Sequence, residues 1–370
     1  MELERALSKP AVVTLINHPM ENQVAVVRKA LLQGGGGGAA RAILDVYRHY
    51  CISGHHMFAM QKFGFDCFVA ESGILDSTSR TCTGHHLETT FIASNMNTPG
   101  TKPGARPDRS LNRAEFVEAI IRLGIQKFYA DGKRRSSAAS TGESVMRLIL
   151  EHLLPLKDTG SKMKKKGVTT PVRDANELRV HVLYSMQIDD VFRKNDNLQY
   201  LKHIFESSCS QKNTDSKNAS RMNHVEWMRF VRKVVETKKV AGDTNIDQLF
   251  RFSETTAKES FLLSRLTVVD EQGVNAERCQ QLSFEDFLEA LVRLTDLMKS
   301  EEEVVAERHG TPSTEGGTWN SNDPDAVAPK LDVLIQGIMG RFDFDGDGNV
   351  SHAEIAHAHR HGRRGTRFEV

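Results

Sequence analysis

The chain has 370 residues, of which 39% are hydrophobic and 26% are charged. Its length predicts roughly two or three domains, and its hydrophobic content suffices for small helical cores. Lys and Arg total 49 against 48 Asp and Glu, so the net charge of +1 excludes a general electrostatic attraction to nucleic acid or to an acidic membrane. No apolar run approaches the roughly 18 residues of a membrane span.

The cysteines and the amino terminus indicate the compartment. The five cysteines form no CxxC pair and are widely spaced, at Cys51, Cys67, Cys82, Cys209 and Cys279. Their odd number and spacing favour reduced thiols over a disulfide framework. The first residues, Met1 to Arg5, lack the basic and apolar regions of a secretory signal. We therefore expect an intracellular, cytoplasmic protein.

Hydrophobic periodicity predicts an all-α fold, with strands limited to short bridges between loops. The N-terminal segment 1–39 contains a predicted helix over 11–33, followed by the polyglycine break Gly34–Gly38. Residues 40–130 then form a first predicted pair of helix–loop–helix units.

Residues 131–173 are predicted to be a linker that contains one amphipathic helix. The helix carries its apolar residues up to Pro155 and is expected to end there. The basic run Lys162–Lys166 follows. Such a run contacts acidic lipid, tubulin tails or nucleic acid in some proteins, but it is more often a solvated linker, and we favour the linker.

Residues 174–300 are predicted to hold a connecting helix and a second pair, and they contain an internal repeat of the first. The segment 111–123 aligns with 282–294, with the same Leu, Phe, Glu, Ala, Arg and Leu in both copies. Upstream, 90–94 parallels 260–264 at nearly the same separation. A repeat of this kind indicates that one structural unit has been used more than once.

The polar segment 301–327, rich in Gly, Pro, Ser, Thr and Asn, is expected to be a flexible tether for the C-terminal segment 328–370. Pro329 is expected near the start of a helix. The apolar positions of this helix recur on one face, at Leu331, Leu334, Ile335, Ile338, Met339 and Phe342.

The sequence DFDGDGNVSHAE at 343–354 follows this helix and satisfies the pattern D-x-[DN]-x-[DN]-G-x5-E at every specified position. Calcium binds six to eight oxygens, and this order of side chains supplies them, with Gly348 allowing the sharp turn. The predicted ligands are the carboxylates of loop positions 1, 3, 5 and 12, the carbonyl of position 7 and a water-holding side chain at position 9: Asp343, Asp345, Asp347, Glu354, Asn349 and Ser351.

On these residues, the segment of roughly 328–362 resembles the EF-hand of the calmodulin superfamily. In that frame an apolar residue at loop position 8 is followed five residues later by the first apolar residue of the exit helix. The same step occurs four more times, in the units 43–73, 90–123, 200–236 and 260–294: Phe58 to Phe63, Leu111 to Phe116, Met222 to Trp227 and Leu282 to Phe287.

These four units lack the turn glycine, and several of their ligand positions carry cations or apolar groups. Lysine or arginine in the shell would repel calcium. Their position 12 is Lys62, Glu115, Glu226 and Asp286 in chain order. We therefore expect tandem degenerate EF-hand-like pairs joined by flexible linkers, although amphipathic helix pairs of other α-proteins imitate this spacing.

The histidines and arginines after Glu354 offer His at i, i+4 spacing for a transition metal, but a basic surface is favoured because no further ligand stands beside them. Catalytic motifs are missing: Gly34–Gly38 is not followed by Lys-Ser/Thr, and G-x-S-x-G and H-E-x-x-H do not occur. We expect no enzyme.

Two functions are consistent with these features. In the first, Ca²⁺ binds Asp343–Glu354 and the chain is a calcium-responsive sensor or adaptor for a protein partner. In the second, it is a helical scaffold in which calcium is a structural clip. The last hand pairs with the second pair in cis, with a second copy of the chain, or with a partner protein. Chains with mostly inactive loops look similar to large cytoskeletal and flagellar EF-hand proteins of unicellular eukaryotes.

Overall fold

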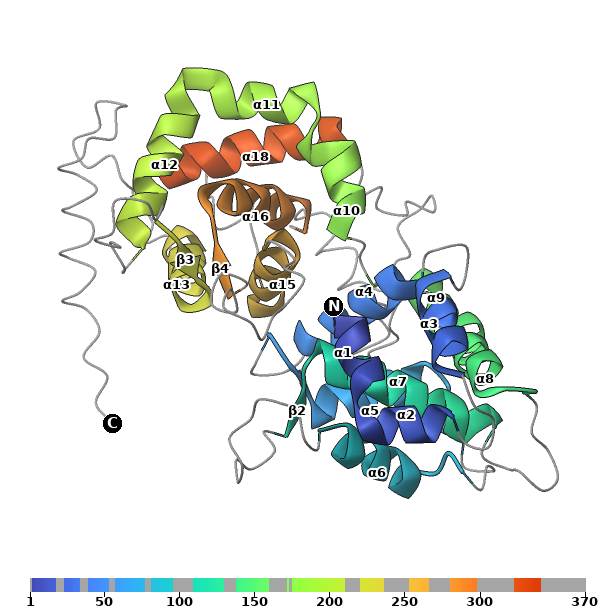
Figure 1. Ribbon diagram of the computed structural model, residues 1–370. Helices are drawn as coiled ribbons and strands as arrows, with labels where there is room; N and C mark the ends of the chain where they lie inside the picture. Colours follow the sequence, from blue (N-terminus) through green and yellow to red (C-terminus); the bar gives the residue numbers. More distant parts are fainter. Residues whose placement is uncertain are drawn as a thin grey trace, which may run out of the picture. The chain divides into compact units, whose positions relative to one another are not determined.

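The computed structural model describes residues 2–17, 23–33, 39–52, 57–76, 81–95, 109–129, 138–159, 172, 175–209, 220–235, 253–265, 280–297 and 323–340. Most of these residues are helical, so the all-α prediction is confirmed, and no described helix is long and apolar enough to cross a membrane. The chain divides into two units, Met1–Asp174 and Ala175–Val370 (Figure 1).

The first unit consists of three leading helices, a pair of helix–strand–helix segments and a trailing helical segment. Its elements are α1 (Glu2–Ser8), α2 (Pro10–Ile16), α3 (Gln23–Gln33), α4 (Ala39–Ile52), β1 (Met60–Gln61), α5 (Lys62–Glu71), α6 (Gly84–Asn95), β2 (Ser110–Leu111), α7 (Arg113–Phe128), α8 (Thr141–Leu148), the π-helical turn η1 (Ile149–Leu153) and α9 (Leu154–Thr159). Strands β1 and β2 pair antiparallel.

The second unit has the same order. Its elements are α10 (Ala175–Leu178), the π-helical turn η2 (Arg179–Leu183), α11 (Met186–Arg193), the 3₁₀ turn η3 (Lys194–Asp196), α12 (Asn197–Ser208), β3 (Met222–Asn223), α13 (His224–Val235), α15 (Glu254–Ser264), β4 (Gln281–Leu282), α16 (Phe284–Asp296) and α18 (Pro324–Met339). Strands β3 and β4 pair antiparallel.

The aromatic cores of the two units are built alike. The rings of Phe68 and Phe116 lie 5.3 Å apart at 70°, and those of Phe230 and Phe287 lie 5.3 Å apart at 69°. Edge-to-face contacts of this kind stabilise a core beyond the burial of area alone. Trp227 completes the second core, where it is fully buried and its Nε1 donates to the carbonyl of Ala257 at 2.8 Å.

The trailing helix occupies the same place in each unit. In the first, α8 packs between the leading helix α3 and the last helix of the pair, α7. In the second, α18 packs between α11 and α16. The helix–strand–helix pair is therefore sealed on one side by helices from both ends of its own unit, as Figure 1 shows for α11, α18 and α16.

Three helix boundaries differ from the prediction. The single helix expected over 11–33 is wrong, because α2 ends at Ile16 and α3 begins at Gln23. The amphipathic helix predicted within 131–173 does not end at Pro155. The turn η1, in which the amide of Leu154 donates to the carbonyl of Ile149, precedes this proline, and α9 continues beyond it. A π-turn alters the hydrogen-bonding pattern where the proline ring and its missing N–H would interrupt an α-helix.

The third difference concerns the helix before the predicted calcium loop. It begins at Pro324, within the segment 301–327 that was expected to be a linker, and Pro329 lies inside it. Asp323 caps the helix by accepting from the amide of Asp325. Pro324 then occupies the first helical position, where a missing N–H has no helical acceptor to lose.

Candidate metal centre

The predicted ligands Asp343, Asp345, Asp347, Asn349, Ser351 and Glu354 lie outside the described residues, as does the histidine- and arginine-rich end of the chain. Within the described ranges no group of three or more His, Cys, Asp or Glu side chains could hold a metal ion. The helix that leads to the loop, α18, is described as far as its C-cap, Gly340.

Helix α18 presents the apolar face that the sequence predicts. Leu331, Ile335 and Ile338 are fully buried, and Leu334 is 1% exposed. These side chains pack where α18 meets η2, α11 and α16. The end of the helix nearest the predicted loop therefore belongs to the core of the second unit.

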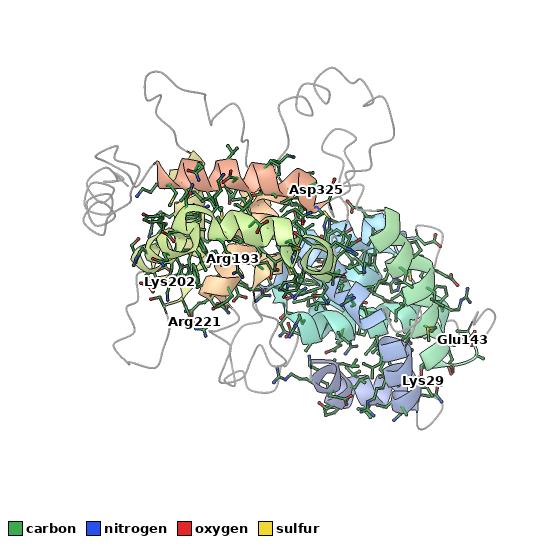
Figure 2. The ribbon with its side chains drawn as sticks, turned by 90° about the horizontal axis from the view of Figure 1, so that it is seen from above. Lys29, Glu143, Arg193, Lys202, Arg221 and Asp325 are labelled. Carbon is green, nitrogen blue, oxygen red and sulfur yellow. The ribbon has the colours of Figure 1, made fainter. Side chains whose placement is uncertain are left out.

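Two polar contacts fix α18 beside α11. Gln187 Nε2 donates to Asp325 Oδ1 at 2.9 Å, and Lys194 Nζ lies 2.6 Å from Asp332 Oδ2. Asp325 stands at the start of α18 (Figure 2). The first contact joins the beginnings of the two helices and the second joins positions farther along both, so the helices run in the same direction. These exposed contacts set the alignment but add little stability.

The strand pairing brings predicted loop positions opposite each other. Met222 faces Leu282, and both had been assigned to loop position 8. In the first unit Leu111 faces Met60 rather than Phe58. The assignment of Phe58 and Phe63 is therefore wrong.

In the corrected frame the step of five residues runs from Met60 to Phe65, which is fully buried, whereas Phe63 is 63% exposed. Phe58 and Phe63 each lie two residues before Met60 and Phe65, so they show the same apolar spacing. Position 12 of this unit becomes Gly64 instead of Lys62. A Cβ at Gly64 would lie 2.5 Å from the carbonyl oxygen of Tyr50 in α4. No side chain, and so no ligand, fits at this position without a shift of the backbone.

The other three residues that the sequence predicts at loop position 12 are acids that cap helices. The Glu115 carboxylate accepts from the amide of Asn112 at 2.9 Å, that of Asp286 from Ser283 at 3.0 Å, and that of Glu226 from Asn223 at 2.8 Å. The Asn or Ser side chain accepts in return from the amide of the acid. Each acid is thus part of a capping box, which satisfies two amides at the start of a helix.

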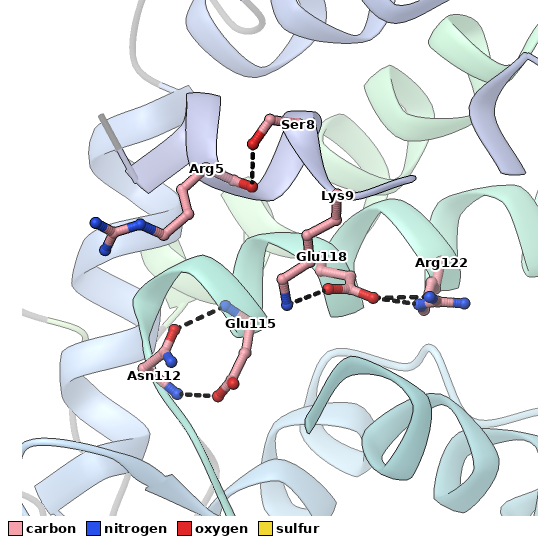
Figure 3. A network of polar contacts seen from close by, with 7 residues as sticks. All are labelled: Arg5, Ser8, Lys9, Asn112, Glu115, Glu118 and Arg122. Atoms are coloured by element: carbon pink, nitrogen blue, oxygen red, sulfur yellow. Dashed lines mark hydrogen bonds and ion pairs between the residues drawn. The ribbon is translucent and has the colours of Figure 1, made fainter. Parts of the chain in front are cut away.

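Each unit also contains a buried carboxylate held by two cations. Glu118 accepts from Lys9 Nζ and from Arg122 Nη2, both at 2.7 Å (Figure 3). Its counterpart in the repeat, Glu289, lies 2.9 Å from Arg179 Nε and 2.7 Å from Arg293 Nη2.

The repeat shows Glu and Arg four residues apart in both copies, but sequence reasoning missed the outer cations. Lys9 and Arg179 come from the leading helical segments, far away in the chain. Burial lowers the pKa of Arg293 from its ordinary value, and Glu289 opposes this by favouring the charged form. The two clusters attach the leading segment of each unit to the last helix of its pair.

The described cysteines, Cys51, Cys67, Cys82 and Cys209, form no disulfide, and Cys51, Cys82 and Cys209 are buried. Burial raises the pKa of the Cys209 thiol to about 12, so this thiol is not activated as a nucleophile. Burial also lowers the pKa of His49 to about 4.

Models of protein families, curated proteins and solved structures were each compared with the chain, and none matches it.

Proposed function

We propose that this protein is a non-enzymatic, calcium-responsive adaptor that binds one Ca²⁺ through Asp343–Glu354. The observation that carries the proposal is the complete set of oxygen ligands in this loop, with Gly348 at the turn. The loop follows directly on α18, whose apolar face is fixed in the second unit. An anchored leading helix is what a helix–loop–helix calcium site requires on its N-terminal side.

The four helix–strand–helix segments are, in this proposal, EF-hand-like units that have lost the ion. The antiparallel pairing of Met222 with Leu282 supports this, because paired calcium loops join through a short bridge at position 8. The capping boxes of Glu115, Glu226 and Asp286 support it too, since each places an acid at position 12.

Calorimetric titration of the full chain with calcium tests the proposal. We expect one binding event in the wild type and none in Glu354→Gln, which lacks the bidentate carboxylate. Glu226→Gln is the matched control: it changes a position-12 acid of the same unit, keeps a capping-box acceptor, and should bind calcium as the wild type does. A wild type without binding heat, or a Glu354→Gln variant that still binds, contradicts the proposal.

A second candidate is a helical scaffold in which calcium is a structural clip, and the burial of α18 favours it. Detaching α18 would expose Leu331, Leu334, Ile335 and Ile338. At about 1.5–3 kcal/mol for each side chain, this costs roughly 6–12 kcal/mol as an upper estimate. Calcium at a hundred times its Kd contributes about 2.7 kcal/mol.

Calcium binding therefore cannot release α18, and any response must lie beyond it in the chain. Far-UV circular dichroism on the calorimetry samples separates the two candidates. A spectral change on calcium addition supports the adaptor, and binding with an unchanged spectrum supports the clip. In both candidates the partner is a protein and the location is the cytoplasm or the cytoskeleton.

A further inference from the structure

We propose that the outer face of α13 binds an acidic segment of a protein partner. This basic face consists of Val225, Met228, Arg229 and Arg232, which recur at i, i+3, i+4 and i+7 and therefore lie on one side of the helix. The inference goes beyond the proposed calcium site, because it assigns a surface and a partner chemistry to the described part of the second unit.

The basic face is accessible, whereas the opposite face of α13 is not. Val225 is 50% exposed, both arginines are exposed and Met228 is partly exposed. The apolar residues of the opposite face are at most 4% exposed and belong to the core of the unit: Trp227, Phe230, Val231 and Val234. Helix α13 is thus anchored through one face, with α15 packed against it, and its basic face points away from the core (Figure 1).

No described side chain neutralises the arginines of this face. Neither Arg229 nor Arg232 forms a hydrogen bond or an ion pair with a described residue, and the same holds for Arg221, directly before β3 (Figure 2). The acid within α13, Glu226, is engaged in the capping box at the start of the helix. The basic face therefore carries positive charge that a ligand from outside the unit can neutralise.

Helix α5 of the first unit is the structural counterpart of α13. Met60 and Met222 are both fully buried, and they pair with the matching leucines of the repeat, Leu111 and Leu282. With these strand residues aligned, the buried positions of the two helices coincide: Phe65, Phe68 and Val69 in α5, and Trp227, Phe230 and Val231 in α13. The outer faces of the two helices can therefore be compared position by position.

This comparison shows that the fold does not require the arginines. The exposed apolar residue Phe63 of α5 corresponds to Val225 of α13. The places of the two arginines are taken by Cys67 and Ala70, which carry no positive charge. Because the first unit folds without cations at these places, the arginines of α13 are available for contacts outside their unit.

The chemistry of the basic face favours an acidic peptide that also carries apolar side chains. A guanidinium group forms bidentate hydrogen bonds with a carboxylate, and Met228 offers an adaptable contact for an apolar side chain. A membrane is disfavoured, because an amphipathic helix binds lipid by inserting its apolar face, and α13 buries that face in its own unit. Nucleic acid is disfavoured, because a phosphate backbone has no apolar group to match Val225.

Fluorescence anisotropy with the full chain tests the proposal. The probe is a short dye-labelled peptide that repeats Glu-Glu-Leu, and a calcium chelator keeps the proposed calcium site out of the result. We expect saturable binding that weakens as salt is added, because salt screens exposed charges. A peptide with Gln in place of Glu should not bind, and one with Ser in place of Leu should bind more weakly.

Charge reversal on the basic face should weaken binding of the Glu-Glu-Leu peptide. Arg229→Glu and Arg232→Glu should each raise the Kd roughly fivefold to tenfold, because an attraction between exposed charges becomes a repulsion. Both residues are exposed, so the far-UV circular dichroism should not change. The matched control is Lys29→Glu, an exposed residue of α3 in the first unit (Figure 2), which changes the net charge equally and should bind as the wild type does.

The absence of saturable binding to the wild type overturns the proposal. An equal loss in Lys29→Glu and in the two arginine variants also overturns it, because the effect would then come from net charge. Binding of phosphatidylserine vesicles or duplex DNA that depends on Arg229 and Arg232, without binding of the peptide, assigns the face to a membrane or a nucleic acid instead. The calcium titration judges the proposed function separately.

Discussion

The buried carboxylate of the second unit offers the sharpest test of how that unit is held together. Glu289 lies between Arg293, whose side chain is 3% exposed, and Arg179, whose side chain is 25% exposed. Glu289→Gln keeps the shape and one carbonyl acceptor but removes the negative charge. The guanidinium groups of Arg179 and Arg293 then lose the carboxylate between them, and Asp296 is the acid that still favours the charged form of Arg293.

The expected loss follows from the burial of the two arginines. Removing one partner of a buried ion pair costs about 3–5 kcal/mol, because the remaining charge is left uncompensated. Arg179 is partly hydrated and the amide oxygen still accepts one hydrogen bond, so the lower end applies, about 3 kcal/mol. With a urea dependence of about 2 kcal/mol/M, the unfolding midpoint should fall by roughly 1.5 M.

Tryptophan fluorescence in urea reports this transition, since both tryptophans, Trp227 and Trp319, belong to the second unit. Measurements in a calcium chelator keep ion binding out of the result. The control is Glu254→Gln, whose side chain is 59% exposed and pairs with Lys258, and it should cost less than about 0.5 kcal/mol. A loss below about 1 kcal/mol for Glu289→Gln would refute the contacts of Glu289 with Arg179 and Arg293 as a source of stability.

Two further predictions concern the first unit. Gly64→Ala should destabilise the first unit by about 1–3 kcal/mol in thermal unfolding, because the new Cβ would meet the carbonyl of Tyr50. The control Gly84→Ala, with open space around the glycine, should not destabilise it. Equal effects of the two variants would contradict the close approach of Gly64 to the Tyr50 carbonyl. The pKa of His49 falls to about 4 in the fold, so the unfolded state binds more protons than the folded state between about pH 4 and 6.5. The free energy of unfolding should therefore decrease as the pH falls through this window, by at most about 1.4 kcal/mol per pH unit. His49→Gln should flatten this dependence in denaturant titrations at several pH values, and the exposed His181→Gln should not; identical slopes in all three proteins would refute it.

Much of the helical framework was predictable, because it depends on local periodicity. The buried face of α18 repeats every three or four residues, and the aligned repeats place Leu111 and Leu282 at the strands that the structure contains. Periodicity cannot fix the register here, because Phe58–Phe63 and Met60–Phe65 have the same apolar spacing, and the strand forms at Met60.

Contacts distant in the chain were not predictable. Lys9 and Arg179 leave no local pattern that points to Glu118 and Glu289, because the pairing exists only after the leading segments have packed. The helical chain passes Pro155 directly after a π-turn, which sequence periodicity does not encode. The ligand set of the predicted calcium site is local in the chain, and the motif alone names it.

The capping boxes at Glu115, Glu226 and Asp286 have a consequence for how such a protein can evolve. Each acid starts the next helix through hydrogen bonds with backbone amides. Substitutions elsewhere in the loops before these acids therefore leave the helix start, and with it the architecture, in place. The loops can therefore change their chemistry one residue at a time while the helices that follow them keep the same start.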